Sequence, residues 1–242
     1  MEWRDRGILL AVRPFGEADS LAYFLTRGHG LASGLIKGGI SRKQRPFLQA
    51  GNTFDITWKA RLADQLGFFA CDPVKLLGAS LYGEPARLAA LASGLAVLHD
   101  CLAAADANGR IFEITEKFID SLAHERDCLL DYANWERELL KELGFELCLD
   151  KCNATGTRED LCYISPKTGH AVCRAAGELY KDVLLPLPEI WNGGRGGCVK
   201  EALNVLEYFY RKRIYSESGR EYPFIRASLA KYAEAEGLQK AA

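Results

Sequence analysis

The stretch SLAYFLTRGHGLASGLIKGG, residues 20–39, decides the fold of this 242-residue chain. Two short apolar runs, Ser20 to Thr26 and Leu31 to Lys37, are separated by Gly28-His29-Gly30 and followed by Gly38-Gly39. Runs of this length between glycine turns are typical of strands, because glycine permits the positive φ that tight turns need. The stretch therefore predicts two consecutive strands.

The same pattern continues on both sides and predicts three further strands, Gly7 to Arg13, Asn52 to Ala60 and Leu66 to Cys71. Five short strands within about 70 residues match an OB-type barrel, whose strand face and loops commonly bind single-stranded nucleic acid. An SH3-like barrel would show a similar pattern, so periodicity alone does not distinguish the two.

After residue 80 the pattern becomes helical. Leucines recur at helical spacing from Glu84 to a predicted stop near Asn108-Gly109, and Pro85 suits a first helical turn. Further helices are predicted at 110–123, 130–143 (closed by Gly144 at C′), 199–215 and 224–235. Between them lies a small insert at about 148–176, with a hairpin at 163–170, and a glycine-rich connector at 193–197.

These elements define an α+β chain with two predicted domains. We predict a five-stranded β-barrel within residues 1–80 and a mainly α-helical domain over residues 81–242 that carries the insert. The start of the sequence lacks the order of a signal peptide, and no apolar run is long enough to span a bilayer. We therefore expect a cytoplasmic protein with no membrane contact and with its eight cysteines reduced.

Charge is distributed unevenly along the chain although its formal net charge is only -1. Residues 1–80 carry 11 Lys and Arg against 7 Asp and Glu, whereas residues 81–194 carry 11 against 19. Residues 195–231 are basic again, with 8 against 4. Such asymmetry suggests a polyanion-binding face built from both ends, although ordinary variation of surface charge gives the same counts.

The segment from Lys37 to Phe47 is the most informative motif. Its four cations, Lys37, Arg42, Lys43 and Arg45, lie within nine residues, beside glycines and an aromatic. Such a loop can follow a phosphate backbone, and on a barrel this interpretation outweighs that of an inert solvated loop. Lys59 and Arg61 extend the predicted DNA-binding surface, and Trp58 fits the surface or the core equally well.

No catalytic motif accompanies this loop. The four histidines have no catalytic spacing, the chain has no G-x-S-x-G elbow, and its glycine-rich stretches lack the ending of a phosphate-binding P-loop. We therefore predict a protein that is not an enzyme.

Four cysteines within the insert, Cys148, Cys152, Cys162 and Cys173, invite a zinc hypothesis. Their spacing contains no C-x-x-C pair, because Thr155 and Ala176 stand where second cysteines would be expected. We predict no metal and no cofactor, which metal analysis of the purified protein would test.

Several motifs together resemble the RecO family of recombination and repair proteins. They are Trp3-x4-Ile8-Leu9-Leu10, Gly16-Glu17-Ala18-Asp19, Leu25-Thr26-x2-His29-Gly30, Lys37-Gly38-Gly39, Pro46-x-Leu48-Gln49-x-Gly51-Asn52 and Glu138-Leu139-Leu140-x2-Leu143-Gly144-Phe145. The resemblance covers most of the chain. It implies an OB-fold domain, a helical domain and a zinc-finger-like insert, from which this sequence departs at Thr155 and Ala176.

The resemblance also implies function. Members of that family bind single- and double-stranded DNA, anneal complementary strands and, with RecR, help load RecA onto DNA coated by single-stranded DNA-binding protein. DNA binding of this kind would place the protein with the nucleoid.

The resemblance further implies a docking site on the helical domain for the acidic, Phe-ending tail of single-stranded DNA-binding protein. Near the carboxy-terminus the sequence brings aromatic and basic residues together, at Tyr208, Phe209, Arg211, Lys212 and Arg213, with Arg226 nearby. The alternative is that Tyr208 and Phe209 belong to the core and the cations to a solvated helix end.

Two other functions remain open from the sequence. One is an adaptor that binds proteins through the acidic helical segment and does not bind DNA. The other is a hydrolase or transferase acting on nucleic acid, which would need carboxylates or metal ligands near the basic face. Salt-dependent DNA affinity separates the first from a DNA-binding protein.

Overall fold

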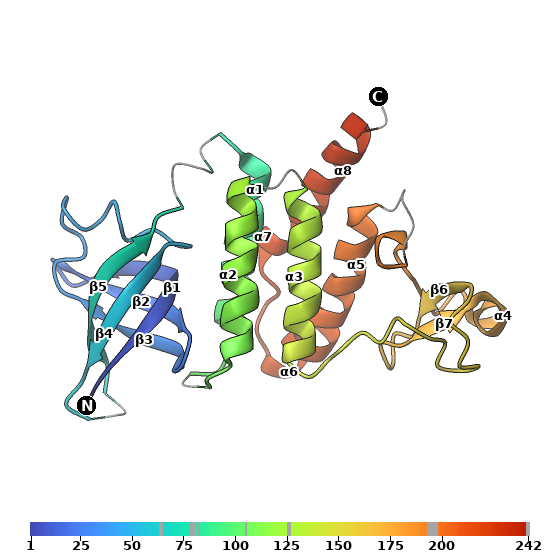
Figure 1. Cartoon of the computed structure of the whole chain (residues 1–242), viewed down its shortest axis with the longest axis horizontal. Helices are drawn as coiled ribbons and strands as arrows, with labels where there is room; N and C mark the ends of the chain where they lie inside the picture. Colours follow the sequence, from blue (N-terminus) through green and yellow to red (C-terminus); the bar gives the residue numbers. More distant parts are fainter. Residues whose placement is uncertain are drawn as a thin grey trace. The chain divides into compact units, whose positions relative to one another are not determined.

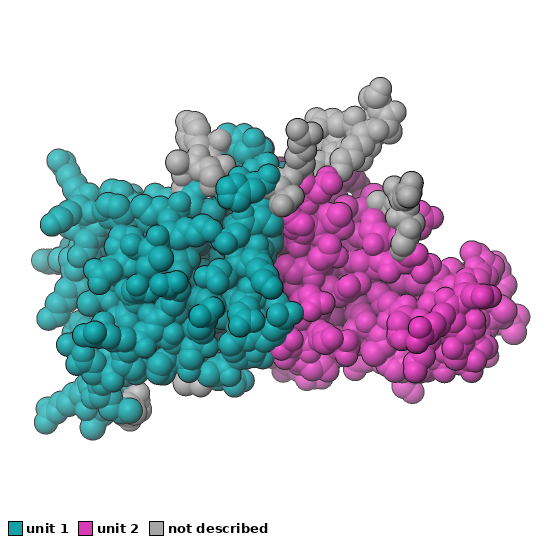
Figure 2. Space-filling view, viewed as in Figure 1, with its two compact units in different colours: residues 1–126 teal, residues 127–242 magenta. Residues whose placement is uncertain are grey.

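A computed structural model of the chain describes residues 1–62, 65–77, 81, 83–104, 106–124, 127–192 and 198–240. The predicted glycine-rich connector at 193–197 lies outside these residues. The chain forms two compact units, Met1–Arg126 and Asp127–Ala242 (Figures 1 and 2), and each is described by itself. The prediction placed a domain boundary at residue 80, where strands give way to helices, whereas packing groups the first two helices with the strands.

Unit 1 begins with a closed five-stranded barrel of strand order β1-β2-β3-β5-β4, as the sequence predicted. Its strands are β1 (Glu2–Phe15), β2 (Asp19–Thr26), β3 (Gly30–Ile36), β4 (Thr53–Lys59) and β5 (Gly67–Lys75). Strand β1 is longer than predicted because it pairs with two neighbours, with β4 along its first half and with β2 along its second. A bulge between Leu9 and Ala11 bends it.

The barrel closes where β3 and β5 pair in parallel, with Gly34 opposite Gly67. A Cβ atom on Gly67 would lie 2.2 Å from the Trp58 ring, and one on Gly34 would lie 2.8 Å from the Phe69 ring. Both positions therefore need glycine, because aromatic rings occupy the space beside the β3–β5 pairing where a Cβ atom would lie.

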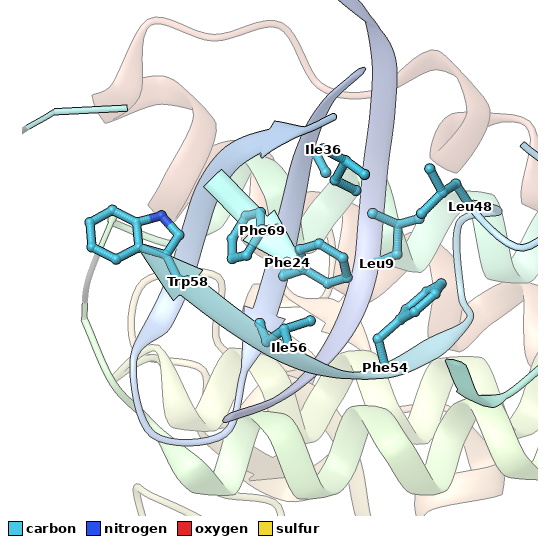
Figure 3. Close-up of a cluster of buried hydrophobic side chains, with 9 residues drawn as sticks. Leu9, Phe24, Ile36, Leu48, Phe54, Ile56, Trp58 and Phe69 are labelled. Carbon is cyan, nitrogen blue, oxygen red and sulfur yellow. The ribbon is translucent and has the colours of Figure 1, made fainter. Parts of the chain in front are cut away.

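Aromatic side chains from several strands fill the barrel (Figure 3). Phe24 meets Phe54 and Phe69 edge to face, at centroid separations of 5.7 and 5.0 Å. Trp58 is 7% exposed and donates its indole N–H to the Ser33 carbonyl at 3.1 Å. Of the two interpretations of Trp58, the core is correct.

Two helices complete unit 1, α1 (Pro85–Cys101) and α2 (Gly109–His124). Helix α1 ends earlier than the predicted stop near residue 108. Leu102 is already extended, and Ala104 then pairs with Leu31 of β3. The second begins after Asn108, whose side-chain oxygen accepts the backbone N–H groups of Arg110 and Ile111.

Unit 2 contains α3 (Cys128–Glu142), α5 (Val199–Tyr210), α6 (Ser216–Ser218), α7 (Phe224–Ala227) and α8 (Leu229–Lys240). Gly144 follows α3 with φ +89, which confirms the predicted C′ glycine. The predicted helix 199–215 is α-helical to Tyr210 and then widens into a π-helical turn, η4 (Arg211–Tyr215). The last predicted helix is divided at Ser228 into α7 and α8.

The insert is a small sheet of order β7-β6-β8. Its elements are β6 (Leu161–Ile164), β7 (Ala171–Cys173), α4 (Arg174–Gly177) and η2 (Glu178–Tyr180), followed by β8 (Leu185–Pro186) and η3 (Glu189–Trp191). The predicted hairpin is present, since β6 and β7 are antiparallel and the Gly169 N–H donates to the Ser165 carbonyl at 2.8 Å.

Candidate nucleic-acid interface

The basic loop between β3 and β4 is fixed to the barrel at its first turn. The backbone N–H of Gly38 donates to the Asp19 carboxylate at 2.9 Å. A Cβ atom on Gly39 would lie 2.6 Å from the Ser20 hydroxyl oxygen, so only glycine lets the loop pass this close to β2. The backbone at the start of the loop is therefore held in one position before its side chains reach solvent.

The rest of the loop folds into hydrogen-bonded turns. The Gln44 and Arg45 N–H groups donate to the Ser41 carbonyl at 3.2 and 3.0 Å, and those of Phe47 and Leu48 donate to the Gln44 carbonyl at 3.0 and 3.2 Å. Turns of this type place residues three apart on the same side of the backbone. The loop thus has two different sides.

One side of the loop borders a hollow of about 650 Å³, whose other walls come from β4 and β5. Phe47 and Phe68 line it and are each 42% exposed. Lys37 and Lys59 also line it, and the Lys37 ammonium lies 4.9 Å from the centre of the Phe68 ring. We call this cavity, with Lys37, Phe47, Lys59 and Phe68 in its wall, the aromatic hollow.

The deeper wall of the aromatic hollow is apolar. Phe54 and Phe69, both buried, lie there together with Cys71. Burial, and to a smaller extent the Asp72 carboxylate, raises the pKa of the Cys71 thiol to about 12. The thiol is therefore neutral at physiological pH and adds no negative charge to this wall, where Asp72 is the acidic side chain among the described lining residues.

The other predicted DNA-binding residues occupy different places. Arg42 and Arg45 line a second hollow, whose wall also includes residues of β1. Lys43 and Arg61 are exposed and line neither hollow. Lys59 contacts Glu2 at 3.1 Å in an exposed ion pair, which contributes little and leaves the ammonium accessible.

Phe68 is the residue of this site that sequence reasoning missed. It precedes the buried Phe69 on β5, and side chains alternate between the two faces of a strand. An aromatic residue on the outward face of a barrel strand was thus the available signal. The prediction instead extended the DNA-binding surface to the cations Lys59, at the end of β4, and Arg61, after it.

The predicted partner-binding cluster is largely occupied by contacts within unit 2. The Lys212 ammonium donates to the Pro166 carbonyl at 3.0 Å, and the Arg213 guanidinium donates to the Lys167 carbonyl. Both acceptors lie in the hairpin turn of the insert. Tyr208 is half-buried and accepts a hydrogen bond from Lys212 at 3.0 Å.

Phe209 and Arg226, also predicted as partner contacts, are 2% and 0% exposed. Two nitrogens of the Arg226 guanidinium bind the two Glu136 carboxylate oxygens, each at 2.6 Å, and one also reaches the Leu203 carbonyl at 3.0 Å. Burial alone lowers the pKa of Arg226, but the Glu136 carboxylate raises it well above its usual value. Both residues belong to the interior, so neither is available to a partner in this structure.

The insert does not fit a structural zinc ion. The Thr155 hydroxyl lies 3.6 Å from the Cys173 sulfur, and the Cys173 N–H donates to the Cys152 sulfur at 3.3 Å. Burial raises the pKa of the Cys152 thiol, but hydrogen bonds from Thr155 and from backbone N–H groups lower it to about 6. Within the described residues, no three His, Cys, Asp or Glu side chains converge as metal ligands. A tetrahedral zinc site takes four ligands.

Within the described ranges, no helix combines the length and the apolar character needed to cross a membrane.

Comparisons with known proteins agree with this architecture. Residues 1–75 match the family model described as Recombination protein O N terminal, and residues 83–219 match Recombination protein O C terminal. Proteins named DNA repair protein RecO are similar along nearly their whole length. The one from Dinoroseobacter shibae is 39% identical over 92% of this chain and 93% of its own. The one from a Ruegeria species is 43% identical over 90% and 89%.

Proposed function

This chain belongs to the RecO family of DNA repair proteins, and we propose that its barrel binds DNA through the basic loop and the aromatic hollow. The observation that supports the proposal most is the aromatic hollow itself. It combines exposed rings at Phe47 and Phe68 with ammonium groups at Lys37 and Lys59.

These two kinds of side chain match the two parts of a nucleotide. Bases stack on aromatic rings whatever their sequence, because every base has a π face. Ammonium groups neutralise phosphates and release counterions, which strengthens binding at low salt. A volume of about 650 Å³ open to solvent suits unstacked bases of a single strand.

The proposal is tested by replacing Lys37, Arg42, Lys43 and Arg45 with alanine and measuring DNA binding by fluorescence anisotropy. Each lost phosphate contact reduces the slope of log affinity against log salt by about 0.7 on single strands. Affinity falls for all sequences alike, because phosphate contacts carry little sequence information. The four cations are exposed, so the fold tolerates their removal.

A matched control removes the same charge elsewhere, at Arg110, Lys117, Lys151 and Arg158, all of which are exposed and line neither hollow. That variant should retain the parental DNA affinity and the parental slope of log affinity against log salt, apart from the small change that its lower net charge causes. Parental binding by the loop variant, with an unchanged slope, would show that the loop is not the DNA site.

We propose further that the chain acts as a mediator of recombination in repair. In this role it binds single- and double-stranded DNA, anneals complementary strands and, with RecR, helps load RecA onto DNA coated by single-stranded DNA-binding protein. No step of this role requires bond chemistry, a metal or a cofactor, and DNA as the ligand would place the protein in the cytoplasm with the nucleoid. Annealing of coated complementary strands, with and without RecR, measures the activity directly.

The proposed docking site for single-stranded DNA-binding protein now rests on Tyr208 and Arg211, because Phe209 and Arg226 are buried and Lys212 and Arg213 hold the insert. Arg211 is exposed and packs over the Tyr222 ring at 4.4 Å. A cation beside aromatic surface suits a peptide that ends in phenylalanine and a carboxylate.

A further inference from the structure

The second hollow beside the loop differs in chemistry from the aromatic hollow. It has a volume of about 730 Å³ and is lined by Arg13, Arg42 and Arg45 among small apolar and polar side chains. The described residues that line it include no aromatic and no acidic side chain. We call it the arginine hollow.

The turns of the loop explain how one segment borders two unlike cavities. Gln44 and Phe47, three residues apart, line the aromatic hollow, and Arg42 and Arg45, also three apart, line the arginine hollow. This spacing puts each pair on its own side of the turns. The loop therefore supplies different polar and aromatic side chains to each cavity, and the buried Leu48 lines both.

Arg13 comes from a different element and is held in place. It lies on β1, and its guanidinium packs over the Tyr23 ring at 5.3 Å and donates to the Tyr23 hydroxyl. The Tyr23 ring is itself held edge to face by His99 at 4.8 Å. A guanidinium fixed in this way loses less freedom on binding than one on a mobile chain.

The loop arginines that line this cavity with Arg13 have no acidic partner among the described residues. In the part of the chain that the structure describes, neither Arg42 nor Arg45 is ion-paired with a carboxylate, and both are exposed. Three guanidinium groups around one cavity repel one another unless an anion is bound. Guanidinium groups bind phosphate oxygens in a bidentate manner, which makes a phosphate the matching anion.

We infer that the arginine hollow is a second nucleic-acid site, which binds the phosphodiester backbone without stacking any base. The inference rests on the proposed DNA binding and divides it between two sites. Bases inside a duplex are not available to Phe47 and Phe68, so duplex DNA depends on the arginine hollow. A single strand uses both sites, with its bases in the aromatic hollow and its continuing backbone across the loop.

Two sets of substitutions test this division, with binding measured on single-stranded and duplex DNA of about 16 nucleotides, the upper end of the site size of one OB fold. One variant carries Arg13→Gln, Arg42→Gln and Arg45→Gln. The other carries Phe47→Leu and Phe68→Leu. All five side chains are exposed, so both variants should fold, and the control Arg110→Gln removes an exposed charge on α2.

The arginine variant should lose duplex affinity by about a hundredfold at 0.1 M salt. The slope of log affinity against log salt should fall by about 0.9 for each phosphate contact that is lost. It should lose single-strand affinity as well. The phenylalanine variant should lose about tenfold on single strands and nothing on duplex. Arg110→Gln should change neither.

Unchanged duplex affinity in the arginine variant would overturn the inference. If, in that case, Lys37→Gln and Lys59→Gln weakened single-strand binding, the proposed DNA binding by the barrel would stand and only the second site would be ruled out. A loss of duplex binding in the phenylalanine variant equal to that in the arginine variant would also overturn the division. A parent protein that bound neither DNA would overturn both proposals.

Discussion

Two clusters of cations in this chain have similar sequences and different surroundings. The loop cluster, Lys37, Arg42, Lys43 and Arg45, has glycines within it and a phenylalanine after it. The helix-end cluster, Arg211 to Arg213, follows tyrosine and phenylalanine residues. In the loop, Lys37, Arg42 and Arg45 border open hollows and Lys43 is exposed. At the helix end, Lys212 and Arg213 donate to carbonyl groups of the insert.

The difference shows what makes a cation available for binding. A cation that already donates to a carbonyl must give up that bond before it can bind an anion, and each such bond contributes about 0.5 to 1.5 kcal/mol to stability. A cation that faces an open cavity gives up only water. We therefore expect the loop cluster to affect binding and the helix-end cluster to affect stability.

Arg226 is the extreme case of an occupied cation, and its loss should have the largest effect on stability. Replacing it with alanine leaves the Glu136 carboxylate buried without its partner, which typically costs about 3 to 5 kcal/mol. Chemical denaturation followed by tryptophan fluorescence measures the loss. The double variant Arg226→Met with Glu136→Leu should recover most of it, because neither charge then remains buried.

If Arg226→Ala reduced the free energy of unfolding by less than about 1 kcal/mol, Glu136 would have found another partner or reached water. The claim that Arg226 is required for stability would then be wrong.

The sequence predicted the barrel because the information is local. Short apolar runs and glycine turns, such as Gly28-His29-Gly30, determine strands and their ends within a few residues. Gly144 determined the end of α3 in the same way. The basic loop was also visible locally, as a run of cations.

Contacts between distant residues were not predictable in this way. Arg226 was predicted as a partner contact near the helix-end cations. Its burial was not predictable, because a fully buried arginine needs a partner and its partner Glu136 lies 90 residues away. The early end of α1 depends on the pairing of Ala104 with Leu31 across the fold. The two sides of the basic loop depend on turn hydrogen bonds that charge and composition do not reveal.

Lys212 and Arg213 provide the next test. Replacing both with glutamine should reduce stability by about 1 to 2 kcal/mol, because two hydrogen bonds to the turn of the insert are lost. Amide hydrogen exchange should speed up in the hairpin at 163–170 and remain unchanged in the barrel. The four-alanine loop variant serves as the comparison and should change stability by less than about 0.5 kcal/mol.

If the loop variant lost as much stability as the Lys212 and Arg213 variant, the loop cations would have structural partners too. The distinction between the two clusters would then be wrong.

Arg211 should show the smallest effect on stability and the clearest effect on partner binding at the helix end. It pairs with Glu207 at 2.7 Å, four residues earlier, and packs over Tyr222. An exposed pair of this kind and a cation–π contact together contribute about 0.5 to 1 kcal/mol. The carboxylate of an incoming peptide can replace Glu207 at little cost, so Arg211 is the cation of this cluster most open to exchange.

Calorimetric titration with an acidic peptide ending in phenylalanine, against the parent and Arg211→Gln, tests the docking site directly. Affinity should fall in the variant while thermal unfolding changes little, and Lys231→Gln, another exposed cation of unit 2, should bind as the parent does. Equal affinity in the Arg211 variant would move the docking site elsewhere, and no binding by the parent would remove this partner. A loss confined to the Lys212 and Arg213 variant would show instead that the insert must be held in place for the peptide to bind.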